Sequence, residues 1–145
     1  MGCDIHLYVE RRVGPAWVAL PAPARGWVGR CGLELPCYWG WYLGRNYQLF
    51  GALAGVRRQP EERMGDPRGL PADVSVAVAD RYPDEKMQEA CLYHSTSYWT
   101  LRELLEFDPP PWWQDRRLGP MKALLRHLCG LGGADDVRIV FWFDN

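Results

Sequence analysis

One stretch constrains the fold of this chain more than any other: the apolar segment at residues 137–145, which reads VRIVFWFDN. Chain ends are normally small and polar, because they fray into water. β-Branched and aromatic residues instead fit a pleated surface that is buried on at least one face. We therefore expect a buried strand here, ending on the carboxylate of Asp144.

A second strand is expected at residues 3–10, where apolar and polar residues alternate with a period of two. This alternation puts Ile5 and Leu7 on one face, and His6 and Tyr8 on the other. Because both segments are so apolar, we expect them to lie side by side in one small antiparallel sheet with helices packed on one face. The sequence thus predicts an α+β fold.

Length and local signals complete this expectation. The chain has 145 residues, which is an ordinary size for one domain, and we expect a single domain spanning residues 1–145. Turn, capping and spacing signals predict a hairpin at Gly14–Pro15 leading to a strand at 16–20, a helix over 45–57, a short helix capped by Ser75, an extended segment at 92–98, a helix opened by the capping box of Thr100 and Glu103, and a helix over 121–129.

Composition excludes several classes of protein. The net charge is −1, so no basic field favours nucleic acid as a partner. No apolar run approaches the ~18 residues that cross a membrane, and no secretion signal is evident, so we expect no membrane partner. Five irregularly spaced cysteines predict reduced thiols in a cytoplasmic protein. Eight tryptophans and seven tyrosines favour a recognition surface.

The first cluster that could carry chemistry follows from strand parity. If the two terminal strands pair, Asp4, His6 and Asp144 share one face with Tyr8 and Trp142. Two carboxylates beside an imidazole could tune a general base or bind a divalent metal. Equally, His6 could simply bond a neighbour on a half-solvated sheet. Both interpretations remain open from the sequence.

The second cluster is His94, Ser95 and Ser97. Residues 94–96 fit the His-x-Thr element of two-histidine phosphoesterases, but the segment at His6 lacks the second hydroxyl residue that this chemistry needs. Cys91 and His94 have zinc-like spacing without a matching pair, so we predict no metal site. A simpler interpretation is that the serines serve turns and caps ahead of the next helix.

The third cluster is Arg45 and Asn46 at an expected helix start, with Arg68 in the following charged loop. Arginine and amide groups beside a helix N-terminus suit an anion. Arg57 and Arg58 are expected only to complement the dipole at the C-terminal end of that helix, which needs no ligand.

Five blocks taken in order resemble a family of short uncharacterised proteins encoded by tailed phages and prophages: residues 1–6, 45–50, 68–75, 94–104 and 138–145. The resemblance implies an accessory protein acting in the cytosol of a host bacterium. It brings no established activity, and the cofactor stays open. The polar residues that the resemblance assigns to the family's pattern are Asp4, His6, Arg45, Asn46, Arg68, Asp73, His94, Ser95, Ser97 and Asp144.

Two functions follow as expectations. In the first, His6, His94 and Asp4 act in one polar pocket whose other groups bind a phosphate-bearing small molecule or nucleotide, with hydrolysis as its reaction. In the second, the protein carries out no chemistry and inhibits a host defence or transcription protein through an aromatic surface. Convergence of the polar residues in one place favours the first; their scatter through structural hydrogen bonds favours the second.

Overall fold

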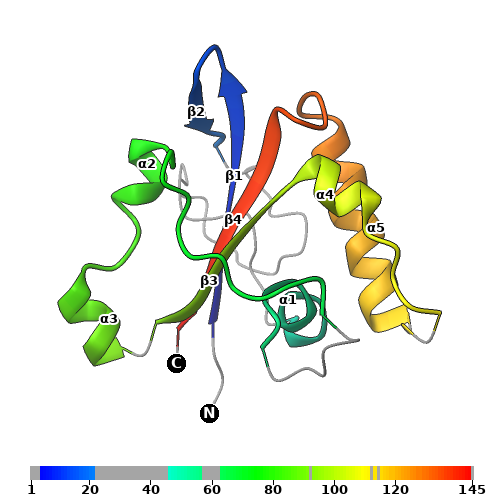
Figure 1. Cartoon of the computed structure of the whole chain (residues 1–145), viewed down its shortest axis with the longest axis horizontal. Helices are drawn as coiled ribbons and strands as arrows, with labels where there is room; N and C mark the ends of the chain where they lie inside the picture. Colours follow the sequence, from blue (N-terminus) through cyan, green and yellow to red (C-terminus); the bar gives the residue numbers. More distant parts are fainter. Residues whose placement is uncertain are drawn as a thin grey trace, which may run out of the picture.

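The computed structural model describes residues 4–21, 46–56, 63–91, 93–111, 113 and 115–144. Its sheet has four strands in the order β2-β1-β4-β3, and all neighbouring strands are antiparallel (Figure 1). The strands are β1 (Asp4–Val13), β2 (Ala16–Ala19), β3 (His94–Thr100) and β4 (Val137–Asp144). The helices are α1 (Tyr47–Ala54), α2 (Val76–Ala79), α3 (Glu85–Cys91), α4 (Leu101–Glu106) and α5 (Asp115–Cys129).

The two strands that lie furthest apart in the chain form the centre of the sheet. β1 and β4 pair from Asp4 opposite Asp144 to Arg11 opposite Val137. The N-terminal end of β1 and the C-terminal end of β4 therefore lie together at one end of the sheet (Figure 1). This pairing confirms the expected α+β fold and its central pair of terminal strands.

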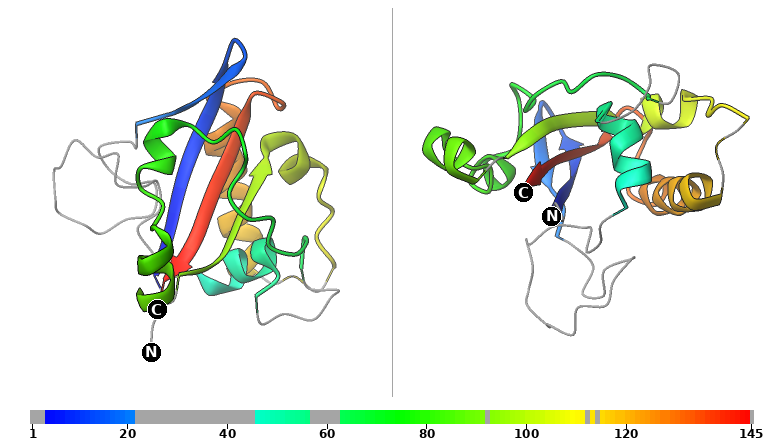
Figure 2. Two further views of the ribbon diagram at one scale, coloured as in Figure 1. Left: turned by 60° about the vertical axis from the view of Figure 1, so that its left-hand side comes forward. Right: turned by 90° about the horizontal axis from the view of Figure 1, so that it is seen from below.

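The first face of the sheet carries the main hydrophobic core. Ile5, Leu7 and Phe141 point to this side, together with Val9, Val137, Ile139 and Phe143. Helices α1, α4 and α5 cover it with Leu53, Leu104 and Leu124 among others (Figure 2). Removing this much apolar surface from water is the main force that holds the helices on the sheet.

The second face is also covered, which corrects the expectation that helices pack on one face alone. Tyr8, Val140 and Trp142 lie here and are buried. Residues 68–82, called the cover segment below, contribute Val78, with Leu70, Val74 and Tyr82 packed around it. Strand β4 carries apolar side chains on both of its faces, so both faces must be covered from water.

Local signals explain where the helices begin. Asn46, Ser75 and Thr100 each accept a hydrogen bond from a backbone N–H in the first turn of their helix, and Thr100 and Glu103 form the complete capping box that the sequence predicts. Helix α5 begins before Gly119 and Pro120, two residues that normally break helices, so the sequence predicted too late a start. Cys129 is exposed and free; Cys3, Cys31 and Cys37 lie outside the described residues.

Candidate functional site

The paired ends of β1 and β4 bring His6 and Asp144 into contact. Nε2 of His6 lies 2.8 Å from Oδ2 of Asp144, and the backbone N–H of Asp4 donates to Oδ1 of the same carboxylate at 3.1 Å. The pair reaches solvent, because 33% of the His6 side chain and 25% of the Asp144 side chain are exposed. Of the residues expected to act together, Asp4, His6 and Asp144 are therefore adjacent.

Aromatic rings surround this pair on the second face. The His6 ring stacks on Trp142 with centroids 5.7 Å apart, and lies tilted against Tyr93 at 6.1 Å. Trp142 also stacks on Tyr8 at 5.0 Å. His6, Asp144, Tyr8, Tyr93 and Trp142 are called the His6 cluster below. The sequence argument placed all of these on one face except Tyr93, which precedes β3 and follows no strand parity.

A cation lies near the cluster. Burial raises the pKa of the Tyr8 hydroxyl, the positive charge of Arg81 opposes this, and Tyr93 adds to it. Arg81 follows α2 and belongs to the cover segment, and the sequence argument did not single it out. Among the described residues no group of three or more His, Cys, Asp or Glu side chains could hold a metal ion. The chemistry available here is therefore that of an imidazole, a carboxylate and a nearby guanidinium.

The geometry defines what His6 can do. A carboxylate that accepts from Nε2 favours the tautomer with its proton on that nitrogen, and it orients the ring. Nδ1 is then an acceptor when the ring is neutral and a donor when it is protonated. The arrangement suits either removal of a proton from water or donation to an anionic oxygen.

His94 lies on the opposite face of the sheet. Residues 94–97 of β3 span the same length as Phe141–Phe143 of β4, so β3 holds one extra residue in a β-bulge. Ser95 takes the left-handed conformation there, with φ 57°. The His94 ring stacks on Phe143 with centroids 5.5 Å apart, on the first face, whereas His6 stacks on Trp142. The structure does not bring the two histidines together.

The bulge also separates His94 from Thr96. Thr96 is buried, and its Oγ1 lies 2.8 Å from the hydroxyl of Tyr82 in the cover segment. His94 and Thr96 therefore face opposite sides, and residues 94–96 do not form the arrangement that a His-x-Thr element requires. Ser97 is fully buried and accepts from the backbone N–H of Arg68 at 3.3 Å.

Arg68 is held in a structural contact. Its guanidinium lies 3.7 Å from the centroid of the Trp99 ring and pairs with Glu103 at 2.9 Å. Burial opposes ionisation of Glu103, but hydrogen bonds from Arg68 and Thr100 outweigh this and lower its pKa. Arg68 thus joins the start of the cover segment to α4, at a distance from the His6 cluster along the sheet.

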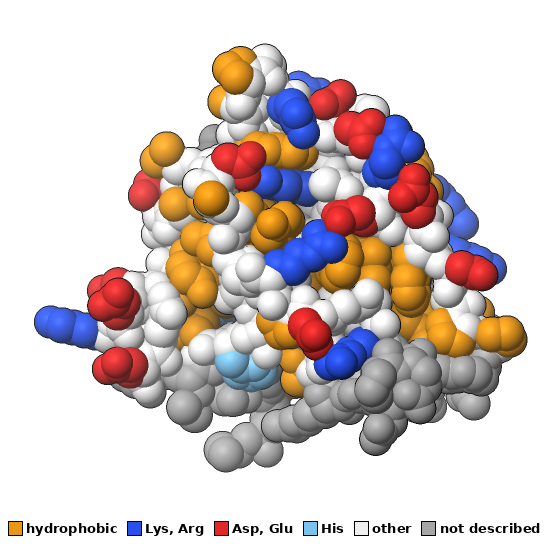
Figure 3. Space-filling view, viewed as in Figure 1, with side chains coloured by type: hydrophobic (Ala, Val, Ile, Leu, Met, Phe, Trp, Pro, Cys, Tyr) orange, Lys and Arg blue, Asp and Glu red, His pale blue; other side chains and the backbone are white. Residues whose placement is uncertain are grey.

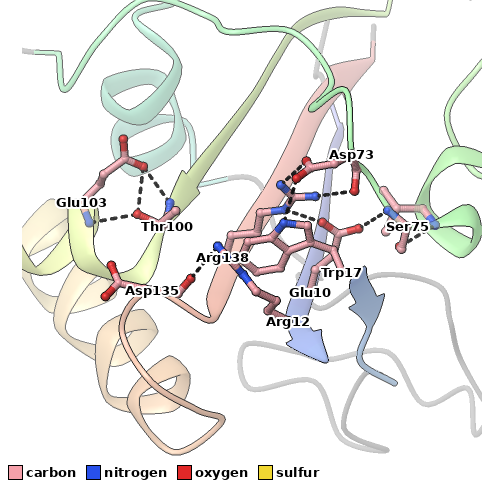
Figure 4. A network of polar contacts seen from close by, with 10 residues as sticks. Glu10, Arg12, Trp17, Asp73, Ser75, Thr100, Glu103, Asp135 and Arg138 are labelled. Atoms are coloured by element: carbon pink, nitrogen blue, oxygen red, sulfur yellow. Dashed lines mark hydrogen bonds and ion pairs between the residues drawn. The ribbon is translucent and has the colours of Figure 1, made fainter. Parts of the chain in front are cut away.

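Asp73 belongs to a second polar network (Figure 4). Arg138 donates to Glu10 at 2.6 Å and to Asp73 at 2.7 Å, and Trp17 donates to Asp73 at 3.0 Å. Glu10 and Arg138 are almost fully buried, and the second Glu10 oxygen accepts from the backbone N–H of Ser75 at 2.7 Å. This network anchors the cover segment to β1 and β4. Glu10 has the same strand parity as His6 and Tyr8, so its place on the second face follows from the alternation in β1.

Asn46 and Arg45 are the remaining residues of the third predicted cluster. Asn46 caps α1 through its Oδ1, which accepts from the N–H of Leu49 at 3.0 Å. Arg45 lies outside the described residues.

Comparison with protein families, with curated proteins and with solved structures finds no match to this chain. No helix in the described part of the chain is both long and apolar enough to span a membrane. The functional argument therefore rests on the geometry of the residues themselves.

Proposed function

We propose that this chain is a phage-type accessory protein of the host cytosol that binds a small phosphate-bearing molecule, such as a nucleotide, at the His6 cluster. In this proposal His6 moves a proton when the bound phosphoester is hydrolysed. The observation that carries the proposal is the 2.8 Å contact between Nε2 of His6 and Asp144, two groups that are both partly exposed. In the view of Figure 3, acidic and basic side chains are interspersed over the described part of this face, so a phosphate ligand would be held by local groups rather than by a broad basic field.

The surroundings of the pair favour an anionic, partly aromatic ligand. An imidazole that a carboxylate orients presents Nδ1 to the ligand, and the protonated ring donates a charge-assisted hydrogen bond to phosphate. Burial raises the pKa of Tyr8, and the positive charge of Arg81 lies close enough to oppose part of that rise. The ring of Tyr93 beside His6 offers a surface on which a nucleobase can stack.

The second candidate function is a non-enzymatic protein that inhibits a host defence or transcription protein. It is favoured by the scatter of Asn46, Arg68, Asp73 and Ser97 into structural hydrogen bonds. An aromatic docking surface finds no support in the described tryptophans, since all of those side chains are buried: Trp17, Trp99, Trp113 and Trp142. We therefore keep the ligand site as the first proposal.

Calorimetric titration with inorganic phosphate and with the common nucleoside monophosphates tests the proposal. We expect the wild-type protein to bind at least one nucleotide more tightly than phosphate. His6→Gln and Asp144→Asn should each weaken this binding by roughly tenfold or more, since a hydrogen bond to a charged group contributes about 1.5–3 kcal/mol.

His127→Gln is the matched control, because His127 lies on α5 and packs away from the His6 cluster. It should bind like the wild type. Phosphate released from the tight-binding nucleotide then separates hydrolysis from binding alone. Equal affinity in the wild type and in His6→Gln would overturn the assignment of the site, and the inhibitor proposal would replace it.

A further inference from the structure

The bulge in β3 holds a serine where a glycine would be less strained. Ser95 has a φ of 57°, and it is the only non-glycine residue with a positive φ in the described part of the chain; Gly14, Gly55 and Gly69 are the others with positive φ. Glycine adopts this conformation without a steric penalty, and it is the usual residue at a bulge of this kind. The backbone of Ser95 is therefore strained in a way that a glycine at this position would avoid.

The retained hydroxyl has a specific partner. Oγ of Ser95 lies 2.8 Å from Nδ1 of His94, at hydrogen-bond distance. The His94 ring is itself held parallel to the ring of Phe143, with centroids 5.5 Å apart and planes 10° apart. Both residues of the pair are half-buried, so neither is sealed in the core. A strained backbone that presents a hydroxyl to an oriented imidazole is an arrangement found at reactive sites.

We propose that Ser95 is a nucleophile activated by His94, and that this pair at the start of β3 hydrolyses small esters. Phe143 and Ile5 are buried in the hydrophobic core and support the His94 ring from behind, so the half-buried Ser95 and His94 are the groups that a substrate can reach. This site does not rest on the His6 cluster, because the two histidines lie on opposite faces.

The reaction balances without a further reactant except water. Ser95 Oγ forms a bond to the ester carbonyl carbon, and its proton passes to Nδ1 of His94. The carbon–oxygen bond to the alcohol breaks, and the alcohol leaves with that proton. Water then attacks the acyl-serine, His94 accepts the water proton and returns it to Oγ, and the carboxylic acid is released.

A fluorophosphonate probe tests the proposal directly, because it traps an activated serine. The Ser95 oxygen forms a bond to phosphorus, fluoride leaves, and the proton passes to His94. Mass spectrometry of the labelled protein should place the adduct on Ser95. His94→Phe keeps a ring to stack on Phe143 but removes Nδ1, and should slow labelling by roughly a hundredfold, the usual contribution of a general base. His127→Gln should label at the wild-type rate.

Ser95→Gly is the decisive second variant. It removes the hydroxyl and relieves the left-handed strain, so we expect labelling to disappear while the melting temperature rises. Labelling that persists in Ser95→Gly, a folded wild-type protein that does not label, or His94→Phe labelling at the wild-type rate would each overturn the proposal. A lower melting temperature in Ser95→Gly would overturn it too, because the serine would then be a structural residue.

Discussion

Asp144 and Asp73 have different roles in this molecule, because their carboxylates contact different side chains. The carboxylate of Asp144 meets a partly exposed imidazole, and the pair is open to solvent. The carboxylate of Asp73 meets the buried guanidinium of Arg138 and the indole N–H of Trp17, and serves to anchor a segment. Both aspartates belong to the predicted site, but in our proposal only Asp144 acts on a ligand, by orienting the ring of His6.

The Asp73 contact predicts a pH dependence of stability. The hydrogen bond from Arg138 lowers the pKa of Asp73 below its ordinary value of 3.8, against the opposing effect of burial. A carboxyl whose pKa is lowered by folding contributes stability that is fully present above its unfolded pKa, and loses it as pH falls towards the folded pKa. The stability difference between wild type and Asp73→Asn should therefore be constant near neutral pH and shrink below about pH 3.8. Urea unfolding at several pH values measures it. A difference that grows on acidification would contradict the account.

The capping box at Thr100 gives a second prediction at this scale. Its hydroxyl accepts from the N–H of Glu103, and the Glu103 carboxylate accepts from the N–H of Thr100. Thr100→Ala should lower the free energy of unfolding by about 1 kcal/mol. Nucleotide binding by the folded protein should be unchanged, because Thr100 lies outside the His6 cluster. A loss of binding at unchanged stability would instead move Thr100 into the site.

At the scale of elements, β3 explains both the success and the failure of the sequence argument. Alternation in β1 and β4 correctly placed His6, Trp142 and Asp144 on one face, because these strands pair without interruption from end to end. The grouping of His94 with His6 rested instead on its small polar neighbours and on the family resemblance, and the bulge in β3 turns His94 to the face of Phe143. One extra residue reverses the facing of every side chain beyond it, and nothing in the sequence around Ser95 marks a bulge, since glycine is absent there.

The cover segment offers a prediction about elements. Arg138 pairs with Glu10 inside the protein, where their side chains are 4% and 0% exposed. Arg138→Met leaves the Glu10 carboxylate buried without its partner, and should lower the free energy of unfolding by about 3–5 kcal/mol.

The double variant Glu10→Gln/Arg138→Met is the control for that prediction. It removes both charges, and should recover a large part of the loss seen in the single variant. A cost below about 1 kcal/mol in Arg138→Met, typical of a surface ion pair, would show that the network does not hold the cover segment. Urea unfolding of all three proteins provides the measurement.

The whole molecule is organised around one strand. β4 pairs with β1 on one side and β3 on the other, and buries side chains on both faces. The apolar composition of residues 137–145 was sufficient to predict its central place. It was not sufficient to predict what covers the second face, because residues 68–82 contain only a short helix and little apolar periodicity.

This organisation predicts how truncation acts. Deleting residues 137–145 removes the strand between β1 and β3, and should leave the protein insoluble. Deleting residues 144 and 145 alone keeps the buried part of β4, and should give a soluble protein that has lost the partner of His6. Centrifugation and circular dichroism of the two truncations distinguish them. A folded, soluble product of the longer deletion would show that β4 is not central.

The central claim is that the bulge separates two histidine sites and that the His6 site binds phosphate-bearing ligands. Nuclear magnetic resonance of the imidazole groups, during titration with the nucleotide that binds in calorimetry, tests it most directly. The chain has three histidines, so assignment by His6→Gln, His94→Phe and His127→Gln is complete. We predict that the signals of His6 shift with ligand concentration while those of His94 and His127 remain in place. A joint shift of His6 and His94, or a shift of His94 alone, would contradict the account.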